Sequence, residues 1–149
     1  MISFQRETVD SWWNDAQPLI FDHWQELGLD TDLKGDIAID KLRILEANGL
    51  WLTMTARDEG KLVGYVVGLF SPHLHYQSSG PMMIVDMYYT KPEYRKGVGA
   101  KMLAFMEQTA RELNAIKIYL SCKVHRDHTK LFMLLGYKLS DFAFTKRIG

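Results

Sequence analysis

The chain has a single cysteine, four prolines and no excess of charge of either sign among its 149 residues. Because one cysteine cannot pair within the chain, an intramolecular disulfide is excluded, which fits a reducing cytoplasm. Lys and Arg together number 18, as do Asp and Glu, so the chain lacks the basic excess that nucleic-acid and membrane-surface binders usually carry. We therefore expect neither nucleic acid nor membrane as a partner.

Long apolar runs are also missing. The longest apolar-rich stretch, Leu62 to Phe70, is too short to cross a bilayer, and the N-terminal residues lack the basic start and apolar run of a signal peptide. The rest is ordinary globular composition, 47% apolar and 24% charged. We expect a single domain over residues 1–149, located in the cytoplasm.

The spacing of apolar residues predicts a mixture of strands and helices. Strands are expected over Ile2–Glu7, Leu50–Ala56, Lys61–Phe70, Met82–Tyr89 and Ile116–Cys122, with a final hairpin in residues 137–148. Helices are expected over Val9–Leu27 (with a kink or break at Pro18), Asp40–Ala47, the residues after Gly99, and Asp127–Leu135, and a polar loop over Gly28–Asp36. The predicted fold class is α/β, a mixed central sheet of about seven strands flanked by about four helices.

The most informative segment is IVDMYYTKPEYRKGVGAKML, residues 84–103. A strand ends before Pro92, and a basic turn with Gly97 and Gly99 opens directly into an amphipathic helix. The backbone N–H groups of such a turn and the positive helix N-terminus favour a phosphate group. The Walker and Rossmann patterns both fail here, since no Gly-Lys-Ser/Thr run is present and Met102 stands where a third glycine is needed. The alternative is that the glycines only shape the helix entry.

This segment resembles the signature of the GNAT superfamily of acyl-CoA N-acyltransferases, in which a strand and a proline precede Arg/Gln-x-x-Gly-x-Gly/Ala and a helix. KLFMLLGYKL is similar to the family's late helix, which ends in Leu-Gly-Phe/Tyr, so the resemblance covers essentially the whole chain. The stretches GKLVGY, PHLHY and FTKRI also look like a phage-associated branch of the superfamily.

The resemblance implies that acetyl-CoA binds in a cleft where the strands around Asp86 and Tyr119 splay apart. The amides of residues 95–100 would hold the pyrophosphate. A bulge near Met87 to Tyr89 would offer an N–H to the thioester carbonyl, and the pantetheine arm would pair with the strand backbone. The implied cofactor-binding residues are Met87, Tyr88, Tyr89, Arg95, Lys96, Gly97, Val98, Gly99, Ala100 and Lys101.

The predicted catalytic residues are Asp86, at a position where the family often places an acid, and Tyr119 and His125. Asp86 is a candidate general base for the acceptor amine, or a structural hydrogen-bonding aspartate. The chain departs from the family at Phe132, where a tyrosine often protonates the leaving thiolate. A phenyl ring cannot donate a proton, so Tyr119, Ser121, His125 or solvent would have to substitute, or the thiolate leaves unaided. The chain also departs at the turn, where Tyr94 occupies the family's Arg/Gln position.

Other side chains with reactive groups have ordinary explanations. His73 and His75 could contact substrate or a metal, but with no carboxylate or cysteine partner nearby an ordinary loop is favoured and no metal site is expected. His125 and His128 share a helix face, and Cys122 is expected to be a buried strand residue rather than a nucleophile. The tryptophans Trp12, Trp13 and Trp24 are expected in the core, at a dimer face or in the acceptor pocket.

These observations predict an enzyme that transfers an acetyl group from acetyl-CoA directly to an amine of a small molecule or a protein. The alternative is a GNAT-fold protein that binds CoA, catalyses weakly and acts as a binding or inhibitory factor, an alternative that Phe132 keeps open. A homodimer is expected only from the habit of the family.

Overall fold

The computed structural model describes residues 1–28 and 32–149. Over these residues the chain forms one five-stranded sheet in the order β1-β2-β3-β4-β5, with four α-helices. The strands are β1 (Ile2–Glu7), β2 (Trp51–Asp58), β3 (Lys61–Pro72), β4 (Pro81–Thr90) and β5 (Lys117–Tyr119). The helices are α1 (Val9–Leu27), α2 (Ile39–Ala47), α3 (Val98–Glu112) and α4 (Thr129–Leu134), with short 3-10 turns at Gln77–Ser79 and Pro92–Tyr94.

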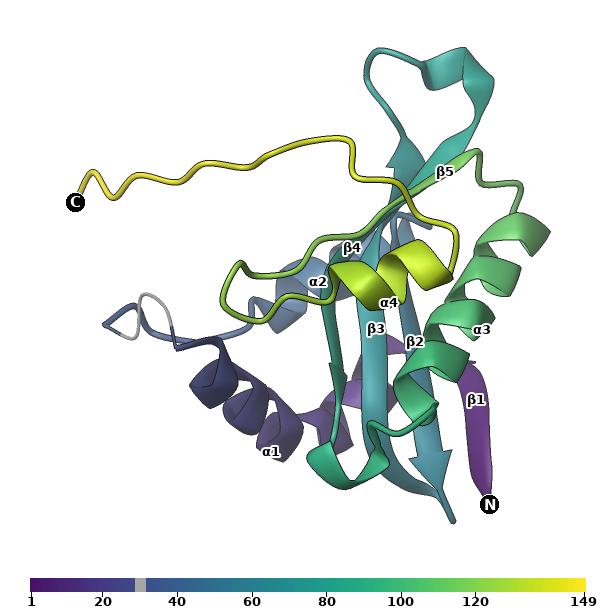
Figure 1. Cartoon of the computed structure of the whole chain (residues 1–149). Coiled ribbons are helices and arrows are strands. Elements are labelled where there is room, and N and C mark those ends of the chain that lie inside the picture. Colours follow the sequence, from purple (N-terminus) through teal and green to yellow (C-terminus); the bar gives the residue numbers. More distant parts are fainter. Residues whose placement is uncertain (29–31) are drawn as a thin grey trace.

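The helices cover both faces of the sheet, so the molecule has three layers (Figure 1). One core lies between the sheet and α3, around Met54, Val66 and Met106. The other lies between the sheet and α1, around Trp12, Tyr65 and Val67. This confirms the mixed α/β class that the sequence predicts.

Helix α1 runs without a break through Pro18, where the sequence predicts a kink or a break. Thr8 caps its start by accepting a hydrogen bond from the N–H of Ser11 at 3.1 Å. Pro18 lies on the exposed face, so the carbonyl that loses its helical partner can bond to water. The buried stripe that begins with Val9 and Trp12 continues on the opposite face and holds the helix to the sheet.

The C-terminal segment differs from the prediction. Residues 138–149 form no strand, so the described sheet has five strands instead of about seven. Their exposed apolar side chains, among them Phe142 and Phe144, give the alternation that predicts a hairpin. A strand forms only where it can hydrogen-bond to the edge of another strand, and an alternating pattern does not show whether such an edge is present. Within this segment Arg147 instead pairs with Asp32, at 2.8 Å to both carboxylate oxygens.

The other predicted elements are present with shifted ends, the largest shift being at β5, which is shorter than Ile116–Cys122. The predicted polar loop Gly28–Asp36 includes residues 29–31, which lie outside the described residues. Among the described helices, none combines the length and apolar character that crossing a bilayer requires.

Strand β4 carries two features that create an opening in the sheet. It pairs in parallel with β5 only from Met82 to Ile84, so its second half continues past the end of β5 without a neighbour on that side among the described strands. It also contains a β-bulge, because Val67 of β3 faces Met87 whereas the next residue, Gly68, faces Val85. Asp86 is therefore the extra residue, one position before the predicted range Met87 to Tyr89.

The bulge exchanges the faces of the sheet to which β4 side chains point. Before it, Met83 and Val85 pack in the core beneath α3. After it, Met87 and Tyr89 pack in the core beneath α1. Since side chains alternate with a period of two along a strand, one inserted residue reverses their direction for the remainder of β4.

A buried ion pair ties the start of α1 to the sheet. The Arg57 guanidinium donates to both oxygens of Glu7 at 2.6 and 2.8 Å, and to Asp15 of α1 at 2.7 Å. The Glu7 side chain is 4% exposed and that of Arg57 is 10% exposed. The pair lies near the edge of the sheet at which β1 and β2 stand, and it holds the first turns of α1 there.

Candidate functional site

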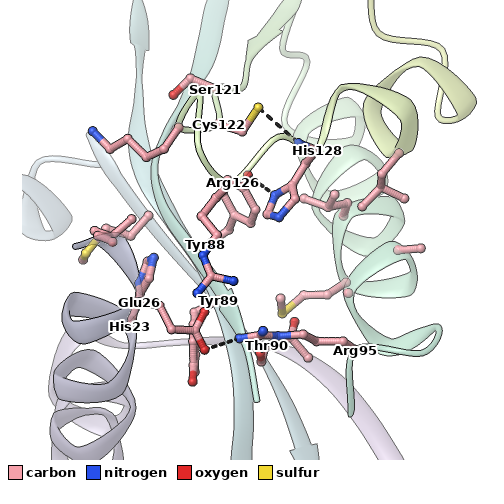
Figure 2. Close-up of a pocket in the computed structure, with 18 of the residues that line it drawn as sticks. His23, Glu26, Tyr88, Tyr89, Thr90, Arg95, Ser121, Cys122, Arg126 and His128 are labelled. Carbon is pink, nitrogen blue, oxygen red and sulfur yellow. Dashed lines mark hydrogen bonds and ion pairs between the residues drawn. The ribbon is translucent and has the colours of Figure 1, made fainter. Parts of the chain in front are cut away.

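A cavity of about 490 Å³ opens beside the second half of β4. Its walls are the start of α3, the segment that joins β5 to α4, and the last turns of α1 (Figure 2). Side chains from both faces of the sheet line it, because Tyr88 points toward α3 and Tyr89 toward α1. The cavity therefore lies at the opening that the short strand β5 leaves in the sheet.

The glycine turn forms one end of the cavity. Gly97 has φ +102°, a conformation that L side chains rarely adopt, and helix α3 begins at the next residue. The first intrahelical bond runs from the N–H of Lys101 to the carbonyl of Gly97 at 3.1 Å. The preceding N–H groups of Val98, Gly99 and Ala100 therefore have no helical acceptor and are available to an anion at the positive end of α3.

Some amides of the turn already have a hydrogen-bond acceptor. The N–H of Arg95 donates to the carbonyl of Pro92 at 3.3 Å, and the N–H of Gly97 donates to that of Arg95 at 2.8 Å. The predicted set of amides, residues 95–100, thus contains two that already bond within the turn.

The backbone of β4 offers further hydrogen-bonding groups to the cavity. The carbonyl of Thr90 accepts a hydrogen bond from Nε of Arg95 at 2.9 Å, so it points away from β3. Backbone groups alternate in direction along an antiparallel strand, which places the N–H and C=O of Tyr88 on the same open side. An extended ligand could pair there as an additional strand would.

Arg95 is held at the cavity wall by an ion pair. Its Nη2 donates to Glu26 of α1 at 2.6 Å, and its guanidinium lies 5.6 Å from the centre of the Tyr89 ring. This contact neutralises Arg95 and joins the glycine turn to α1. Lys123 and Arg126, on the segment between β5 and α4, also line the cavity and supply it with further positive charge.

The α1 wall carries a neutral histidine. His23 Nδ1 lies 2.9 Å from the hydroxyl of Tyr65, and its ring stacks on Tyr89 with centroids 5.0 Å apart. Burial lowers the pKa of His23 to about 4. At neutral pH the imidazole is therefore uncharged, and this wall is aromatic with the carboxylate of Glu26 beside it.

The opposite wall carries a tyrosine and a histidine in contact. The hydroxyl of Tyr88 and Nδ1 of His128 are 2.7 Å apart (Figure 2). Phe132, 8% exposed, packs edge to face against both rings, at 5.9 Å from Tyr88 and 6.0 Å from His128. The hydroxyl group that Phe132 lacks is thus present on a neighbouring ring.

The structure brings most of the predicted binding residues to the cavity. Those that line it are Met87, Tyr88, Tyr89, Arg95, Gly97, Gly99 and Ala100. Lys96, Val98 and Lys101 do not line it, although the amide of Val98 is one of those without a helical acceptor. Lys96 and Lys101 are exposed.

Of the predicted catalytic residues, Asp86 alone lines the cavity. The residue as a whole is exposed at the bulge, but partial desolvation of its carboxyl raises the pKa of Asp86 above the ordinary value. Tyr119 instead accepts a hydrogen bond from Nζ of Lys117 at 3.1 Å. His125 Nε2 lies 2.5 Å from the carbonyl of Leu27 and connects the loop before α4 to the end of α1.

The sequence gives no direct signal for several residues of the cavity. His23 and Glu26 lie on α1, far from the glycine turn in sequence, and Lys123 and Arg126 lie in a loop of no recognisable motif. His73 and His75 contact one another edge to face, with ring centroids 4.9 Å apart, in the β3–β4 connection, and neither lines the cavity. Within residues 1–28 and 32–149, no group of three or more His, Cys, Asp or Glu side chains is placed to hold a metal ion.

Comparison with known proteins identifies relatives. Residues 7–137 match the model of the acetyltransferase (GNAT) family. The chain is 30% identical over 89 residues to the aminoalkylphosphonate N-acetyltransferase of Salmonella typhimurium, a match that covers 57% of this chain and 58% of that protein. The matched segment thus spans less than two thirds of the curated relative.

Solved structures share the fold over the full length. A ribosomal-protein-alanine N-acetyltransferase from Brucella melitensis superposes with a TM-score of 0.75 at 20% identity, covering 100% of both chains. A predicted acetyltransferase from Clostridium acetobutylicum, solved with acetyl-CoA, superposes with a TM-score of 0.65 at 19% identity over 99% of this chain and 96% of that one. At these identities the likeness concerns the fold.

Proposed function

Since the chain belongs to the GNAT family of acetyltransferases, we propose that it transfers an acetyl group from acetyl-CoA directly to the amine of an acceptor. The observation that carries the proposal is the open edge of β4, which faces a cavity that ends at the free amides of α3. The family uses acetyl-CoA, and these residues fit that molecule's parts in order along the strand.

The phosphate end is assigned to the glycine turn. The pyrophosphate of acetyl-CoA would bind at the N–H groups of Val98, Gly99 and Ala100, with Lys123 and Arg126 nearby as counter-charges. The pantetheine arm would then pair with the open carbonyl of Tyr88 and the open backbone groups of Thr90, which leaves the N–H of Tyr88 for the thioester. This arrangement directs the thioester toward the bulge at Asp86.

The reacting end lies at the bulge. Acetyl-CoA carries an already activated acyl group, so the protein has to position the amine, stabilise the charge that develops on the carbonyl oxygen and remove a proton. The N–H of Tyr88 faces the cavity and is the donor we assign to that oxygen. Asp86 is the group we assign to accept the proton of the amine, directly or through water.

For the acceptor we propose a small-molecule amine. The support is the relative from Salmonella typhimurium, whose name gives it an aminoalkylphosphonate as substrate. We also propose a cytoplasmic location, because a single cysteine fits a reducing compartment. A homodimer is expected from the habit of the family, and light scattering would test it. A panel of 2-aminoethylphosphonate, an aminoglycoside and a peptide with an N-terminal alanine, followed by release of the CoA thiol, would identify the acceptor class.

The binding step is tested by titration calorimetry with acetyl-CoA and with NADH. Wild-type protein is expected to bind acetyl-CoA in the micromolar range and not NADH. Gly99→Glu is expected to weaken acetyl-CoA binding by about a hundredfold, because it places a carboxylate where the phosphates bind. The fold should tolerate it, since a Cβ at Gly99 meets only Thr90 Oγ1, at an ordinary 3.5 Å.

Ala104→Glu is the matched control, because it adds the same charge to the exposed face of the same helix, outside the cavity. Its affinity should equal that of the wild type. Folded wild-type protein that binds no acetyl-CoA would remove the proposed function, whereas equal affinities of the Gly99→Glu variant and the control would remove the assignment of the phosphates to this turn.

The role of Asp86 is tested by Asp86→Asn. We expect kcat to fall by about a hundredfold, in the range typical of a lost general base. In the wild type, kcat/KM should fall as the pH drops through the raised pKa of Asp86, and this decrease should be missing from the pH profile of the variant. The control Glu93→Gln alters an exposed carboxylate outside the cavity, and a variant at position 86 that retains a third of the wild-type rate would contradict the assignment.

A further inference from the structure

The side chain at position 132 cannot protonate the leaving thiolate. Phe132 stands there, and its ring is buried against Tyr88 and His128. The inference below rests on the proposed function, since it concerns the departure of CoA in that reaction.

Tyr88 carries a hydroxyl group in the cavity on a ring that contacts Phe132. Its ring packs edge to face on Phe132 with centroids 5.9 Å apart, and its oxygen is 2.7 Å from Nδ1 of His128. Both Tyr88 and His128 line the cavity. The backbone of Tyr88 is also the part of β4 that we assign to the thioester, so backbone and side chain of one residue face the same ligand.

The surroundings keep the phenol protonated and the imidazole neutral. Burial raises the pKa of Tyr88, and the nearby Cys122 adds a smaller effect in the same direction. Burial is the largest cause that lowers the pKa of His128, and the charges of Arg95 and Arg126 lower it further. Asp127 and Glu26 raise it by a smaller amount. A neutral imidazole with its proton on Nδ1 donates to the phenol oxygen and leaves the phenol O–H free to turn into the cavity.

Two of the donors that the sequence suggests lie outside the cavity, and the thiol of Cys122 is already engaged. The Tyr119 hydroxyl accepts from Lys117 on β5, and His125 is engaged with the carbonyl of Leu27; neither residue lines the cavity. Cys122 does line it, but its sulfur accepts the backbone N–H of His128 at 3.4 Å.

We propose that Tyr88, oriented by His128, is the residue that protonates the departing CoA sulfur. As the bond between the acetyl carbon and sulfur breaks, the sulfur takes the bonding electron pair and the phenolic proton of Tyr88. The phenolate that remains keeps its hydrogen bond from Nδ1 of His128 and recovers a proton from water. The proton lost by the amine goes to Asp86 or to water, so protons and charge balance.

The test begins with a property that needs no acceptor, the pKa of the thiol of CoA bound to the protein. It is measured from thiolate absorbance as the difference between the complex and the free protein. A hydroxyl that donates to the thiolate lowers this pKa, so Tyr88→Phe should raise it by about one unit relative to the wild-type complex. His128→Ala should raise it by less, and the control Tyr119→Phe should leave it unchanged.

The second measurement is acetyl transfer to the acceptor that the panel identifies. Tyr88→Phe should lower kcat by about a hundredfold, with the dissociation constant for CoA unchanged within about threefold. Adding Phe132→Tyr to this variant should restore a large part of the rate, because it places a hydroxyl on the adjacent ring.

An unchanged thiol pKa in Tyr88→Phe, or a rate within threefold of the wild type, would overturn the proposal. A shift of the thiol pKa in Tyr119→Phe but not in Tyr88→Phe would move the role to Tyr119. These results differ from a failure of the proposed function, in which the wild-type protein itself would bind no CoA.

Discussion

Gly68→Ala is expected to lower the free energy of unfolding by about 4 kcal/mol and to abolish binding of acetyl-CoA. A Cβ at this position would lie 2.2 Å from the carbonyl oxygen of Ile84 and 2.9 Å from Cα of Val85. Both atoms belong to the backbone of β4 just before the bulge, so no side-chain movement can relieve the contact. The strand pair would have to open at the point that directs Tyr88 and Asp86 to the cavity.

Chemical denaturation followed by circular dichroism measures the first effect and calorimetry the second. Gly99→Ala serves as the control for stability, because its Cβ makes only an ordinary contact at 3.5 Å. If Gly68→Ala unfolds at the wild-type denaturant midpoint and still binds acetyl-CoA, then the close approach of β3 and β4 is not what fixes the bulge.

Arg57→Met is expected to cost about 3–5 kcal/mol of stability, because it leaves the buried carboxylate of Glu7 without its cation. Burial raises the pKa of Glu7, but hydrogen bonds from Arg57 and Thr55 outweigh it and lower the pKa to about 2. Since this value lies below that of the unfolded chain, the stability from the pair is present above about pH 5 and is lost as the pH falls toward 2.

Urea denaturation at several pH values measures both effects. In Arg57→Met the loss of stability between pH 5 and pH 2 should be much smaller than in the wild type, because Glu7 is then protonated in the folded state. The double variant Glu7→Gln/Arg57→Met should recover part of the lost stability, since no buried charge remains unpaired. A single variant with the wild-type unfolding midpoint at pH 7 would show that the pair contributes nothing.

The order of elements was predictable because local patterns determine it. The strand that ends before Pro92 and the helix that follows Gly97 are visible in the alternation and spacing of the residues themselves. The free amides follow from the same local information, since they belong to the first turn of α3. Helix α1 shows a limit of such reasoning, because Pro18 does not end the helix and lies on its exposed face.

The features that depend on pairing were not predictable to the residue. The bulge falls at Asp86 because Gly68, on another strand, allows the backbone of β4 to approach. The contact of Tyr88 with His128 joins residues 40 positions apart and has no sequence signature. The hairpin predicted for the C-terminal residues fails for the same reason, since an alternating pattern does not specify a partner.

The short pairing of β4 with β5 has a consequence for aggregation. An unpaired strand edge is normally a template on which another chain can add a strand, and proteins protect such edges. Here the free edge of β4 lies in a cleft with α3 on one side and α1 on the other, and the ion pair between Glu26 and Arg95 lines it. A slender single ligand can reach this backbone, whereas the edge of a second sheet, with side chains on both faces, is too wide to enter. We therefore expect the free half of β4 not to act as a template for self-association, although it is open to the proposed cofactor.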